Sequence, residues 1–376
     1  MNRVLYEAGS GLRTPLRDWP TWLHLDLPLL ALLGALSGVG LVILYSAGGA
    51  EMDLLVRQLI RLGLAFAVMF AVAQVPSDWM YRLAPVLYGV SLALLVLVML
   101  LGDIGKGAQR WLDLGVIRFQ PSELMKLAMP LMIARYLQDR GIPPQHWDVP
   151  IVLALIGGPV LLIAEQPDLG TAVLVMTAGM AVLFLGGLGW RWIMALSAAL
   201  GAALPLVWAL MHDYQRQRVL TLFDPEADPL GTGYHIIQSK IALGSGGLFG
   251  KGWLNGTQAH LQFLPEGTTD FIFAVYGEEF GLIGLLLLLG IYFAVTVRGL
   301  QIAGNGQNGF ERLLAASLSF TFLFYVLVNT GMVSGILPVV GVPLPLISYG
   351  GTSMVTLLAG FGMLMSIQTH KKMLAP

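Results

Sequence analysis

Long apolar segments are the feature of this sequence that most restricts its fold. A helix needs about 20 mostly apolar residues to cross the hydrocarbon core of a membrane. Ten stretches come close to that requirement, at residues 27–47, 54–75, 83–102, 121–137, 149–164, 170–188, 191–211, 271–297, 312–333 and 344–367. Because 56% of all residues are hydrophobic and only 11% are charged, a water-soluble globular domain is excluded. The sequence predicts an all-α, polytopic integral membrane protein with about ten transmembrane helices.

The positive charges give these helices a narrow preference for one orientation. An even number of crossings places both termini on one side, and slightly more Lys and Arg residues fall on that side than on the other. The positive-inside rule makes that side cytoplasmic, while the small margin leaves the reverse orientation open. The cations of the opposite face predict an anionic ligand there. Residues 1–26 have no apolar block, so we expect a cytoplasmic N-terminal segment without a cleavable signal peptide.

One connection is much longer than the others. Residues 212–269 separate the seventh and eighth apolar segments, and a connection of this length is usually functional. It is extracytoplasmic if both termini are cytoplasmic. Within it, residues 234–243 place Ile236, Ile237 and Ile241 on one stripe, which predicts a short helix at the membrane interface. No linker divides the chain, so residues 1–376 are expected to form a single transmembrane domain.

A carboxylate stands where the eighth apolar segment begins. Asp270 follows Thr268 and Thr269 and precedes the apolar run FIFAV. An acid at this position can stabilise the start of a helix, or it can take a proton from an attacking hydroxyl. The residues alone leave both interpretations open. Glu278 and Glu279 lie two turns further along, and we interpret both as structural partners of a donor in another helix.

The fourth apolar segment begins with polar residues at helical spacing. Glu123 and Lys126 are three residues apart, so they share one face of a helix and can form a pair. Near hydrocarbon each charge needs its partner, which makes the two together a polar notch in the membrane. This position favours a functional role over a purely structural one.

Other polar residues allow two interpretations each. Asp168 can cap the sixth helix, or it can bind a metal or a sugar. Arg216 and Arg218 follow the seventh helix and can bind lipid headgroups or the pyrophosphate of a substrate. The histidines do not have the spacing of a zinc site, and cysteine is absent. A net charge of −1 gives no reason to expect a nucleic-acid partner.

Six motifs, in order along the chain, resemble those of the SEDS (shape, elongation, division and sporulation) family of peptidoglycan polymerases, in particular its elongation members. The motifs are GAQRWLDLGVIRFQPSELMK, EQPDLGT, HDYQRQRV, DPLGTGYHIIQSKIALGSGGLFGKGW, FLPEGTTDFIFAVYGEE and NTGMVSGILPVVGVPLPLISYGGTS. The resemblance extends from about the first predicted helix to Lys372 and implies a fold of ten transmembrane helices.

The resemblance also implies an activity. It indicates an inverting glycosyltransferase of the bacterial inner membrane that uses lipid II and serves cell elongation and rod shape. The enzyme would join the 4-hydroxyl of an acceptor N-acetylglucosamine to the anomeric carbon of a lipid-linked N-acetylmuramic acid, releasing undecaprenyl pyrophosphate. A class B penicillin-binding protein, which is a transpeptidase, is the implied partner. A divalent cation, magnesium or manganese, could assist, although its ligands are unknown; no organic cofactor is expected.

Individual residues of this sequence match functional positions of the family. Asp270 matches its essential aspartate and is assigned as the general base on the extracytoplasmic face. Glu123 and Lys126 match its paired residues and are assigned a catalytic role. Seven further residues match polar positions of the cavity and are assigned to substrate binding: Arg110, Gln120, Ser122, Asp168, Arg216, Arg218 and Lys240.

The sequence departs from the family at one position, and other functions are conceivable. Elongation members commonly have histidine directly before the Thr-Asp pair, where this chain has Thr268. Any supporting role of that histidine is therefore in doubt here. The alternatives are a lipid II flippase or other transporter, and a non-catalytic scaffold for elongation enzymes. Transporters tend to place ionisable residues near the bilayer midplane, whereas here they gather at helix ends, which favours surface chemistry.

Overall fold

The computed structural model describes residues 23–371, with gaps at residues 102, 106–107, 114–117, 212, 228–230, 262 and 265. Within these residues, ten helices coincide with the ten predicted apolar segments. They are α1 (Leu27–Ala47), α2 (Met52–Ala73), α3 (Ser77–Leu101), α4 (Pro121–Arg140), α5 (Asp148–Glu165), α6 (Leu169–Leu185), α7 (Trp190–Leu210), α11 (Ile272–Gly304), α12 (Gly309–Val333) and α13 (Thr352–Thr369). The predicted all-α class is confirmed.

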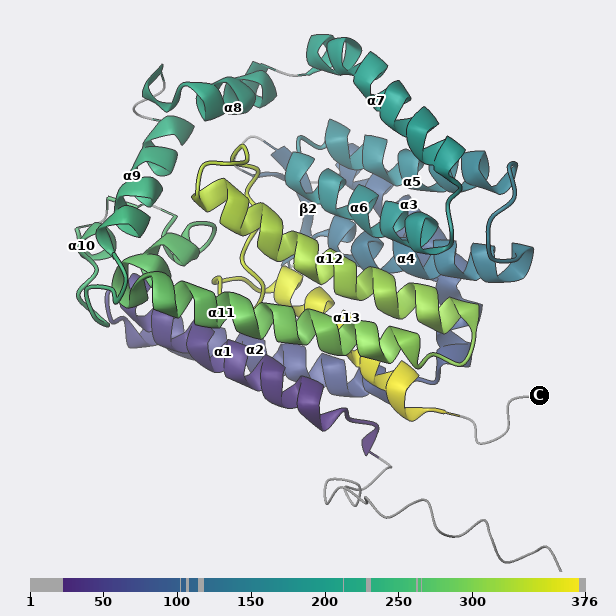
Figure 1. The fold of residues 1–376 in the computed structure, drawn as a ribbon, viewed down its shortest axis with the longest axis horizontal. Coiled ribbons are helices and arrows are strands. Elements are labelled where there is room, and N and C mark those ends of the chain that lie inside the picture. The colour runs from purple at the N-terminus through teal and green to yellow at the C-terminus, as the bar shows by residue number, and fades with distance from the viewer. Residues whose placement is uncertain are drawn as a thin grey trace, which may run out of the picture.

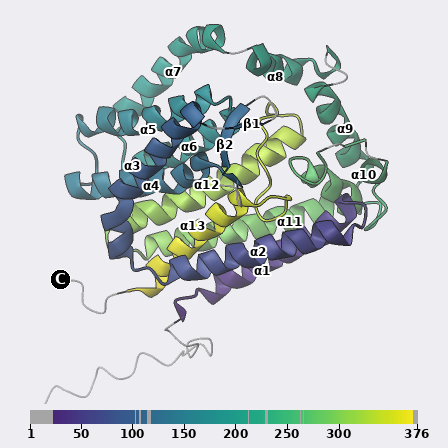
Figure 2. The ribbon, with the colours of Figure 1, turned by 180° about the vertical axis from the view of Figure 1, so that it is seen from behind.

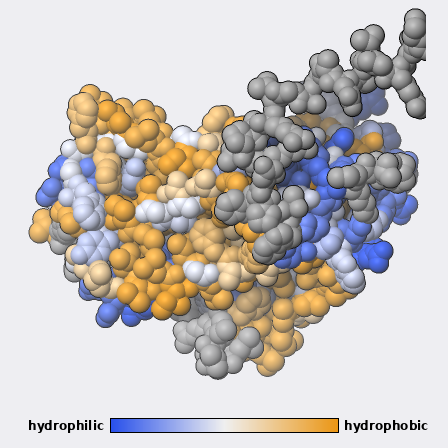
Figure 3. Space-filling view, turned by 90° about the horizontal axis from the view of Figure 1, so that it is seen from below, coloured by the Kyte–Doolittle hydropathy of each residue, from blue (hydrophilic) through white to orange (hydrophobic). Residues whose placement is uncertain are grey.

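The apolar helices make this a multi-pass membrane protein. Within the described ranges, seven helices are long and apolar enough to cross a membrane, namely α1, α2, α3, α5, α11, α12 and α13. Helix α6 and most of α7 are apolar but shorter by this measure. Figure 3 shows one face of the molecule, with a broad hydrophobic area across the middle and hydrophilic residues toward both ends. The total of about ten crossings stays a prediction.

The long helices form a bundle in which close backbone approaches occur at glycine. Helices α11 and α13 lie beside α1 and α2 in both ribbon views, and α12 lies beside α11 (Figures 1 and 2). Helix α13 packs along α2, and a Cβ atom added at Gly362 of α13 would overlap the carbonyl oxygen of Met69 of α2. Small residues allow such contacts between membrane helices. Helices α7, α8 and α9 follow one another in an arc outside this bundle (Figure 1).

The long connection between α7 and α11 is largely helical. It contains α8 (Asp213–Phe223), a 3₁₀ turn η3 (Pro225–Ala227), α9 (Thr232–Ser245) and the short α10 (Thr257–His260). Helix α9 includes the short helix predicted at residues 234–243. Its isoleucines do not form one stripe against lipid, however, because Ile236 is buried and Ile241 is exposed. Ser239 of α9 donates a hydrogen bond to the Val333 carbonyl at the end of α12, 2.8 Å away, which turns this face of α9 toward the bundle.

Helix α11 is interrupted at Gly281, where φ is +65°. The carbonyls of Glu278 and Glu279 accept from the amides of Lys251 and Gly252, and the amides of residues 282 and 283 donate to carbonyls of residues 247 and 248. The connection therefore satisfies backbone groups that an unbroken helix would pair internally. Residues 272–280 at the start of α11 form a short helix that a kink separates from the rest.

The two glutamates before this break have structural partners. Glu279 accepts a hydrogen bond from Ser46 of α1, which confirms the predicted partner in another helix. Glu278 is fully buried, and its Oε1 lies 2.6 Å from Lys251 Nζ. Lys251 belongs to the connection rather than to an apolar helix, so the prediction for Glu278 was right about the role and wrong about the partner's location.

The tenth helix begins later than predicted. Residues 344–351 were expected to be helical, but α13 starts at Thr352. Pro343 and Pro345 lack the amide hydrogen that a helix needs and restrict the residues before them. We call residues 341–351 the 341–351 loop. It is mostly buried, and its backbone is held by donors such as Tyr292, whose hydroxyl bonds to the Pro345 carbonyl at 2.7 Å. Irregular backbone at membrane depth is tolerated where protein surrounds it.

A small β-sheet joins α3 to α4. Strands β1 (Asp103–Gly105), β2 (Ala108–Asp113) and β3 (Arg118–Phe119) pair antiparallel in the order β1-β2-β3. Leu112 lies opposite Phe119, which fixes the approach of the chain to α4. The apolar pattern of the sequence did not predict these strands, because they are short and lie between two long helices.

The two ends of the described chain meet. The imidazole rings of His24 and His370 stack with centroids 3.6 Å apart. Asp26, which caps α1, accepts from Arg298 Nε near the end of α11 at 3.0 Å. Asp270 contacts Asn329 near the end of α12, whose start follows the end of α11. The turns of α12 between residues 309 and 329 span roughly 30 Å at 1.5 Å per residue. Asp270 and the chain ends are therefore at opposite ends of the bundle.

Candidate active site

The start of α4 carries a buried ion pair. Lys126 Nζ lies 2.7 Å from Glu123 Oε1, and the two residues are 7% and 4% exposed. Pro121 occupies the first turn, where its missing amide hydrogen costs nothing and its fixed φ suits a helix. The predicted pairing is confirmed. Because both charges are withdrawn from water, each depends on the other for compensation.

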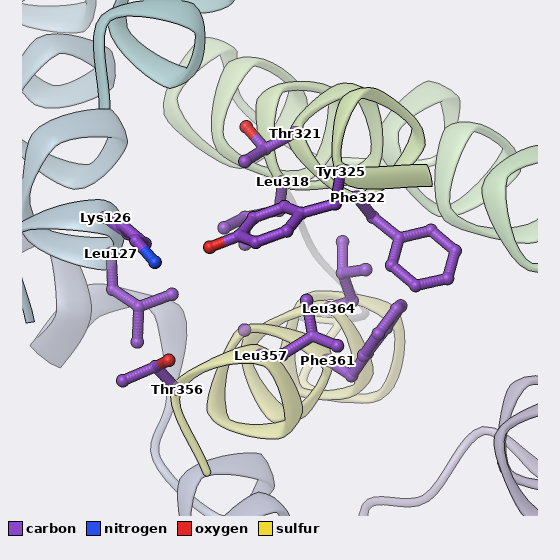
Figure 4. Close-up of a pocket in the computed structure, with 11 residues that line it drawn as sticks. Lys126, Leu127, Leu318, Thr321, Phe322, Tyr325, Thr356, Leu357, Phe361 and Leu364 are labelled. Atoms are coloured by element: carbon purple, nitrogen blue, oxygen red, sulfur yellow. The ribbon is translucent and has the colours of Figure 1, made fainter. Parts of the chain in front are cut away.

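Two side chains from other helices complete this pair. Thr356 of α13 donates from Oγ1 to Glu123 Oε2 at 2.8 Å, the carboxylate oxygen that does not face Lys126. Lys126 Nζ lies 5.2 Å from the ring centroid of Tyr325 on α12, within cation–π distance. Figure 4 shows the Tyr325 hydroxyl and the Lys126 ammonium turned toward one another. Three helices therefore meet at one charged pair.

A small cavity lies beside the pair. Its volume is about 40 Å³, and Lys126, Tyr325 and Thr356 line its polar side (Figure 4). One water molecule occupies about 30 Å³ in the liquid, so the cavity accommodates about one. A second cavity of about 20 Å³ shares Tyr325 with the first and reaches Ser348 of the 341–351 loop. Tyr325 thus borders both cavities, and the second lies beside the loop whose Ser348 contacts the turn before Asp270.

Asp168 joins three other predicted residues at the start of α6. Its Oδ1 accepts from the Thr171 amide at 3.3 Å, which confirms that it caps this helix. Its Oδ2 accepts from Gln120 Nε2 at 2.9 Å, and Arg110 Nη1 is 3.9 Å from Oδ1. Arg110 also donates to two backbone carbonyls of the turn before α6. Ser122 is buried at the start of α4, next to Glu123. The structure therefore brings Arg110, Gln120, Ser122 and Asp168 together near the ion pair.

Asp270 lies in a turn directly before α11 and does not cap the helix. The capping position is Phe271, which makes no side-chain capping bond. Asp270 is partly exposed. A Cβ atom added at Gly341 would lie 3.4 Å from Asp270 Oδ2, so the carboxylate faces a glycine of the 341–351 loop. Its backbone carbonyl accepts from Asn329 Nδ2 of α12 at 2.8 Å. Helix capping therefore does not account for this carboxylate.

One face of α12 connects Asp270 with the ion pair. Asn329 contacts the Asp270 backbone, and Tyr325, four residues earlier, contacts Lys126. Residues four apart are neighbours on a helix surface, about 6 Å apart along its axis. The two groups consequently belong to the same end of the bundle.

The remaining predicted cations lie on the arc of α8 and α9 (Figure 1). Arg216 donates to the carbonyls of Trp208 and Ala209, at 3.0 and 2.7 Å, where α7 ends. Lys240 is exposed and lies against Gly335 just after α12. Arg218 is partly buried on α8. In the part of the chain that the structure describes, Arg216 and Lys240 contact helix ends, and the structure does not bring them into the group at α4 and α6.

An apolar groove separates the arc from the bundle. It has a volume of about 850 Å³ and lies between α5, α6, α7 and α12. Met176, Phe184, Leu200 and Phe324 are among its lining residues, and no charged side chain lines it in the described part of the chain. The groove is large enough for a long hydrocarbon chain.

No clustered metal ligands occur among the residues that the structure describes. No group of three or more His, Asp or Glu side chains there could hold a metal ion.

Comparison with known proteins identifies the family. The family model for FtsW, RodA and SpoVE, described as a cell cycle protein, matches residues 22–373. The chain belongs to this family. It is 53% identical over 353 residues to the peptidoglycan glycosyltransferase MrdB of Escherichia coli K12, covering 94% of this chain and 95% of that protein.

Solved structures agree with the family assignment. One, from work on the structural coordination of polymerization and crosslinking by a peptidoglycan synthase complex, has a TM-score of 0.80 and 38% identity. The match covers 92% of this chain and 98% of that one. The rod shape determining protein RodA of Thermus thermophilus has a TM-score of 0.71 and 32% identity, over 94% of this chain and all of that one.

Sequence reasoning missed four polar residues that contact the site of this FtsW–RodA–SpoVE chain. They are Tyr325, Asn329, Ser348 and Thr356. All four lie in or beside apolar helices, where a polar side chain needs a partner. That signal was present in the sequence. The identity of each partner required the three-dimensional arrangement.

Proposed function

We propose that this protein is a peptidoglycan glycosyltransferase that polymerises lipid II for cell elongation and rod shape. One observation carries the proposal: the partly exposed carboxylate of Asp270 and the buried Lys126–Glu123 ion pair lie at the same end of the bundle. Both groups contact one face of α12. The activity of the relative MrdB, as a peptidoglycan glycosyltransferase, supports the same reaction.

Asp270 acts as the general base in this proposal. The 4-hydroxyl of the acceptor N-acetylglucosamine attacks the anomeric carbon of the lipid-linked N-acetylmuramic acid as Asp270 takes its proton. The bond from that carbon to the diphosphate breaks, and undecaprenyl pyrophosphate leaves from the opposite face, which inverts the configuration. The cationic groups of Lys126 and Arg110 stabilise negative charge as it develops on the leaving diphosphate.

The other predicted residues bind the substrates. Gln120, Ser122 and Asp168 surround the ion pair and supply donors and acceptors for sugar hydroxyls. Arg216, Arg218 and Lys240 lie on the arc, where they can meet the diphosphate or lipid headgroups before substrate reaches the bundle. The apolar groove between α5, α6, α7 and α12 suits the undecaprenyl chain, because apolar side chains line most of its 850 Å³.

We propose that a divalent cation would be bound by the diphosphate of the substrate rather than by residues of this chain. Magnesium or manganese bound to the diphosphate would neutralise charge. Chelation by EDTA in the polymerisation assay tests this requirement directly, since a metal-independent reaction would continue unchanged.

We also propose a location and a partner. The end of the bundle that carries Asp270 faces outward from the inner membrane, and the end with His24 and His370 faces the cytoplasm, in line with the positive-inside preference. The likeness to a chain studied in a peptidoglycan synthase complex supports a class B penicillin-binding protein as the partner. Residues 212–269 would then be extracytoplasmic.

Purified protein with fluorescent lipid II tests the function. We expect glycan ladders on a gel from the wild type and none from Asp270→Asn. Ladders of normal intensity from the variant would remove Asp270 as the base. Lipid II transport in liposomes without polymer would favour a flippase, and intact partner binding without either activity would favour a scaffold.

A further inference from the structure

Three consecutive backbone carbonyls leading to Asp270 each accept a hydrogen bond from a different group. The Thr268 carbonyl accepts from the Tyr349 amide at 2.9 Å. The Thr269 carbonyl accepts from Ser348 Oγ at 2.6 Å, and the Asp270 carbonyl accepts from Asn329 Nδ2 at 2.8 Å. Such complete pairing is unusual for a turn outside a helix, where backbone groups commonly face water.

Asn329 links this turn to the 341–351 loop. Its side chain is fully buried, and Nδ2 donates to the carbonyls of both Asp270 and Val342, each at 2.8 Å. The amide nitrogen of Asn329 has two N–H bonds, one for each of these carbonyl oxygens. The orientation of the amide is therefore fixed by its acceptors. One buried side chain holds Asp270 and the loop at a constant separation.

Ser348 makes the second side-chain link. Its Oγ accepts from the Leu344 amide at 2.7 Å while donating to the Thr269 carbonyl. The Ser348 carbonyl in turn accepts from Gln58 of α2 at 3.3 Å. The hydroxyl therefore closes the loop on itself and joins it to the turn. Ser348 is 4% exposed, so these bonds do not compete with bulk water.

The loop held in this way also borders the Asp270 carboxylate. Gly341 has φ of +73°, a region that favours glycine, and its α-carbon faces Asp270 Oδ2. The position of the carboxylate thus depends on the same segment that the two side chains fix.

We propose that Asn329 and Ser348 are positioning residues for the catalytic carboxylate of Asp270. This inference rests on the proposed function, in which Asp270 is the base. They act through the backbone of residues 269 and 270 and through the 341–351 loop. Neither takes part in the proton transfer. A base displaced by about 1 Å can lower a rate about 100-fold, which sets the scale of the effect.

The matched pair of variants is Ser348→Ala and Ser317→Ala. Ser317 is also buried and donates one bond from Oγ to the Ala178 carbonyl of α6, at 2.8 Å, away from Asp270. Both substitutions remove a serine donor to a backbone carbonyl of another segment. A purely structural role predicts the same behaviour for both.

We expect Ser348→Ala to lower kcat for lipid II polymerisation about 10- to 100-fold with KM changed less than about threefold. Ser317→Ala should keep kcat within about twofold, and Ser348→Thr, which retains a hydroxyl, should recover most of the rate. Asn329→Asp, which loses the donor to both carbonyls, should lower kcat at least as much as Ser348→Ala. Thermal unfolding in detergent reports whether each variant is folded.

The outcomes distinguish this inference from the proposed function. If Asp270→Asn is inactive while Ser348→Ala and a folded Asn329→Asp keep wild-type kcat, the positioning role is wrong and the base assignment stands. If Asp270→Asn polymerises normally, the base assignment itself fails. Equal losses of kcat in Ser348→Ala and Ser317→Ala would also overturn the positioning role, because they would trace the effect to general destabilisation.

Discussion

Replacing Lys126 by methionine separates the stability of the buried pair from its chemical role. Methionine has a similar length and no charge, so Lys126→Met leaves Glu123, which is 4% exposed, without its cation. Thr356 Oγ1 would remain as a donor to the Glu123 carboxylate. Removing one partner of a buried ion pair costs about 3–5 kcal/mol, mainly because the other charge stays buried. We expect a loss of that size in the free energy of unfolding.

The double variant Lys126→Met/Glu123→Gln provides the control. Glutamine keeps an oxygen that can accept from Thr356 and carries no charge to bury. Replacing a whole buried pair by neutral residues is often close to neutral for stability, so the double variant should regain most of what the single variant loses. Polymerisation of lipid II should be absent from both variants, because neither has the ammonium group.

The measurement combines denaturation in detergent micelles with the glycan-ladder assay on the same preparations. A double variant as unstable as Lys126→Met would show that the two charges are not coupled. Wild-type ladders from either variant would refute the role of Lys126 in stabilising the leaving diphosphate.

Three further predictions concern other parts of the molecule. Lys251→Met should lower the free energy of unfolding, measured by denaturation, by about 2 kcal/mol. The loss is limited because the buried Glu278 keeps its donors from Thr257 and Gln258. An unchanged free energy would show that Lys251 and Glu278 are not coupled. Gly362→Ala should destabilise the protein by about 1–3 kcal/mol, because the added methyl group meets Met69. Gly290→Ala should not, because the space beside Gly290 is open. Equal melting temperatures of the two variants would contradict this. Burial lowers the pKa of His370 below 6.5, and repulsion from His24 lowers it further. The contribution of His370 to stability is therefore complete above pH 6.5 and is lost as the pH falls below that value. The melting temperature of His370→Phe should fall less on acidification than that of the wild type.

The sequence was sufficient to predict the helices but not the irregular segments between them. Apolar runs located ten helices to within a few residues at most ends, because the hydrocarbon layer fixes their length. The exceptions were the start of α3, the end of α11 and the start of α13. At α13, Pro343 and Pro345 lie in an apolar run and are nevertheless incompatible with a regular helix. The break at Gly281 was similarly hidden, since it depends on residues 247–252 supplying the missing backbone partners.

The candidate site was predictable where it is local. Glu123 and Lys126 are three residues apart on one helix, so their pairing followed from helical geometry. The partners Tyr325 and Thr356 lie about 200 residues further along the chain, and only the packing of α4, α12 and α13 brings them together. The same holds for Asn329 and Ser348 beside Asp270. Polar residues in apolar helices signal that a partner exists without identifying it.

The central claim is that the Asp270 carboxylate meets the acceptor hydroxyl. A structure of the protein with a lipid-linked disaccharide acceptor and an uncleavable donor analogue tests it most directly. We predict that an Asp270 carboxylate oxygen lies about 2.6–3.2 Å from the 4-hydroxyl of N-acetylglucosamine. Sugars bound at the opposite end of the bundle, beside His24 and His370, would contradict the account, as would an acceptor hydroxyl paired with a different base.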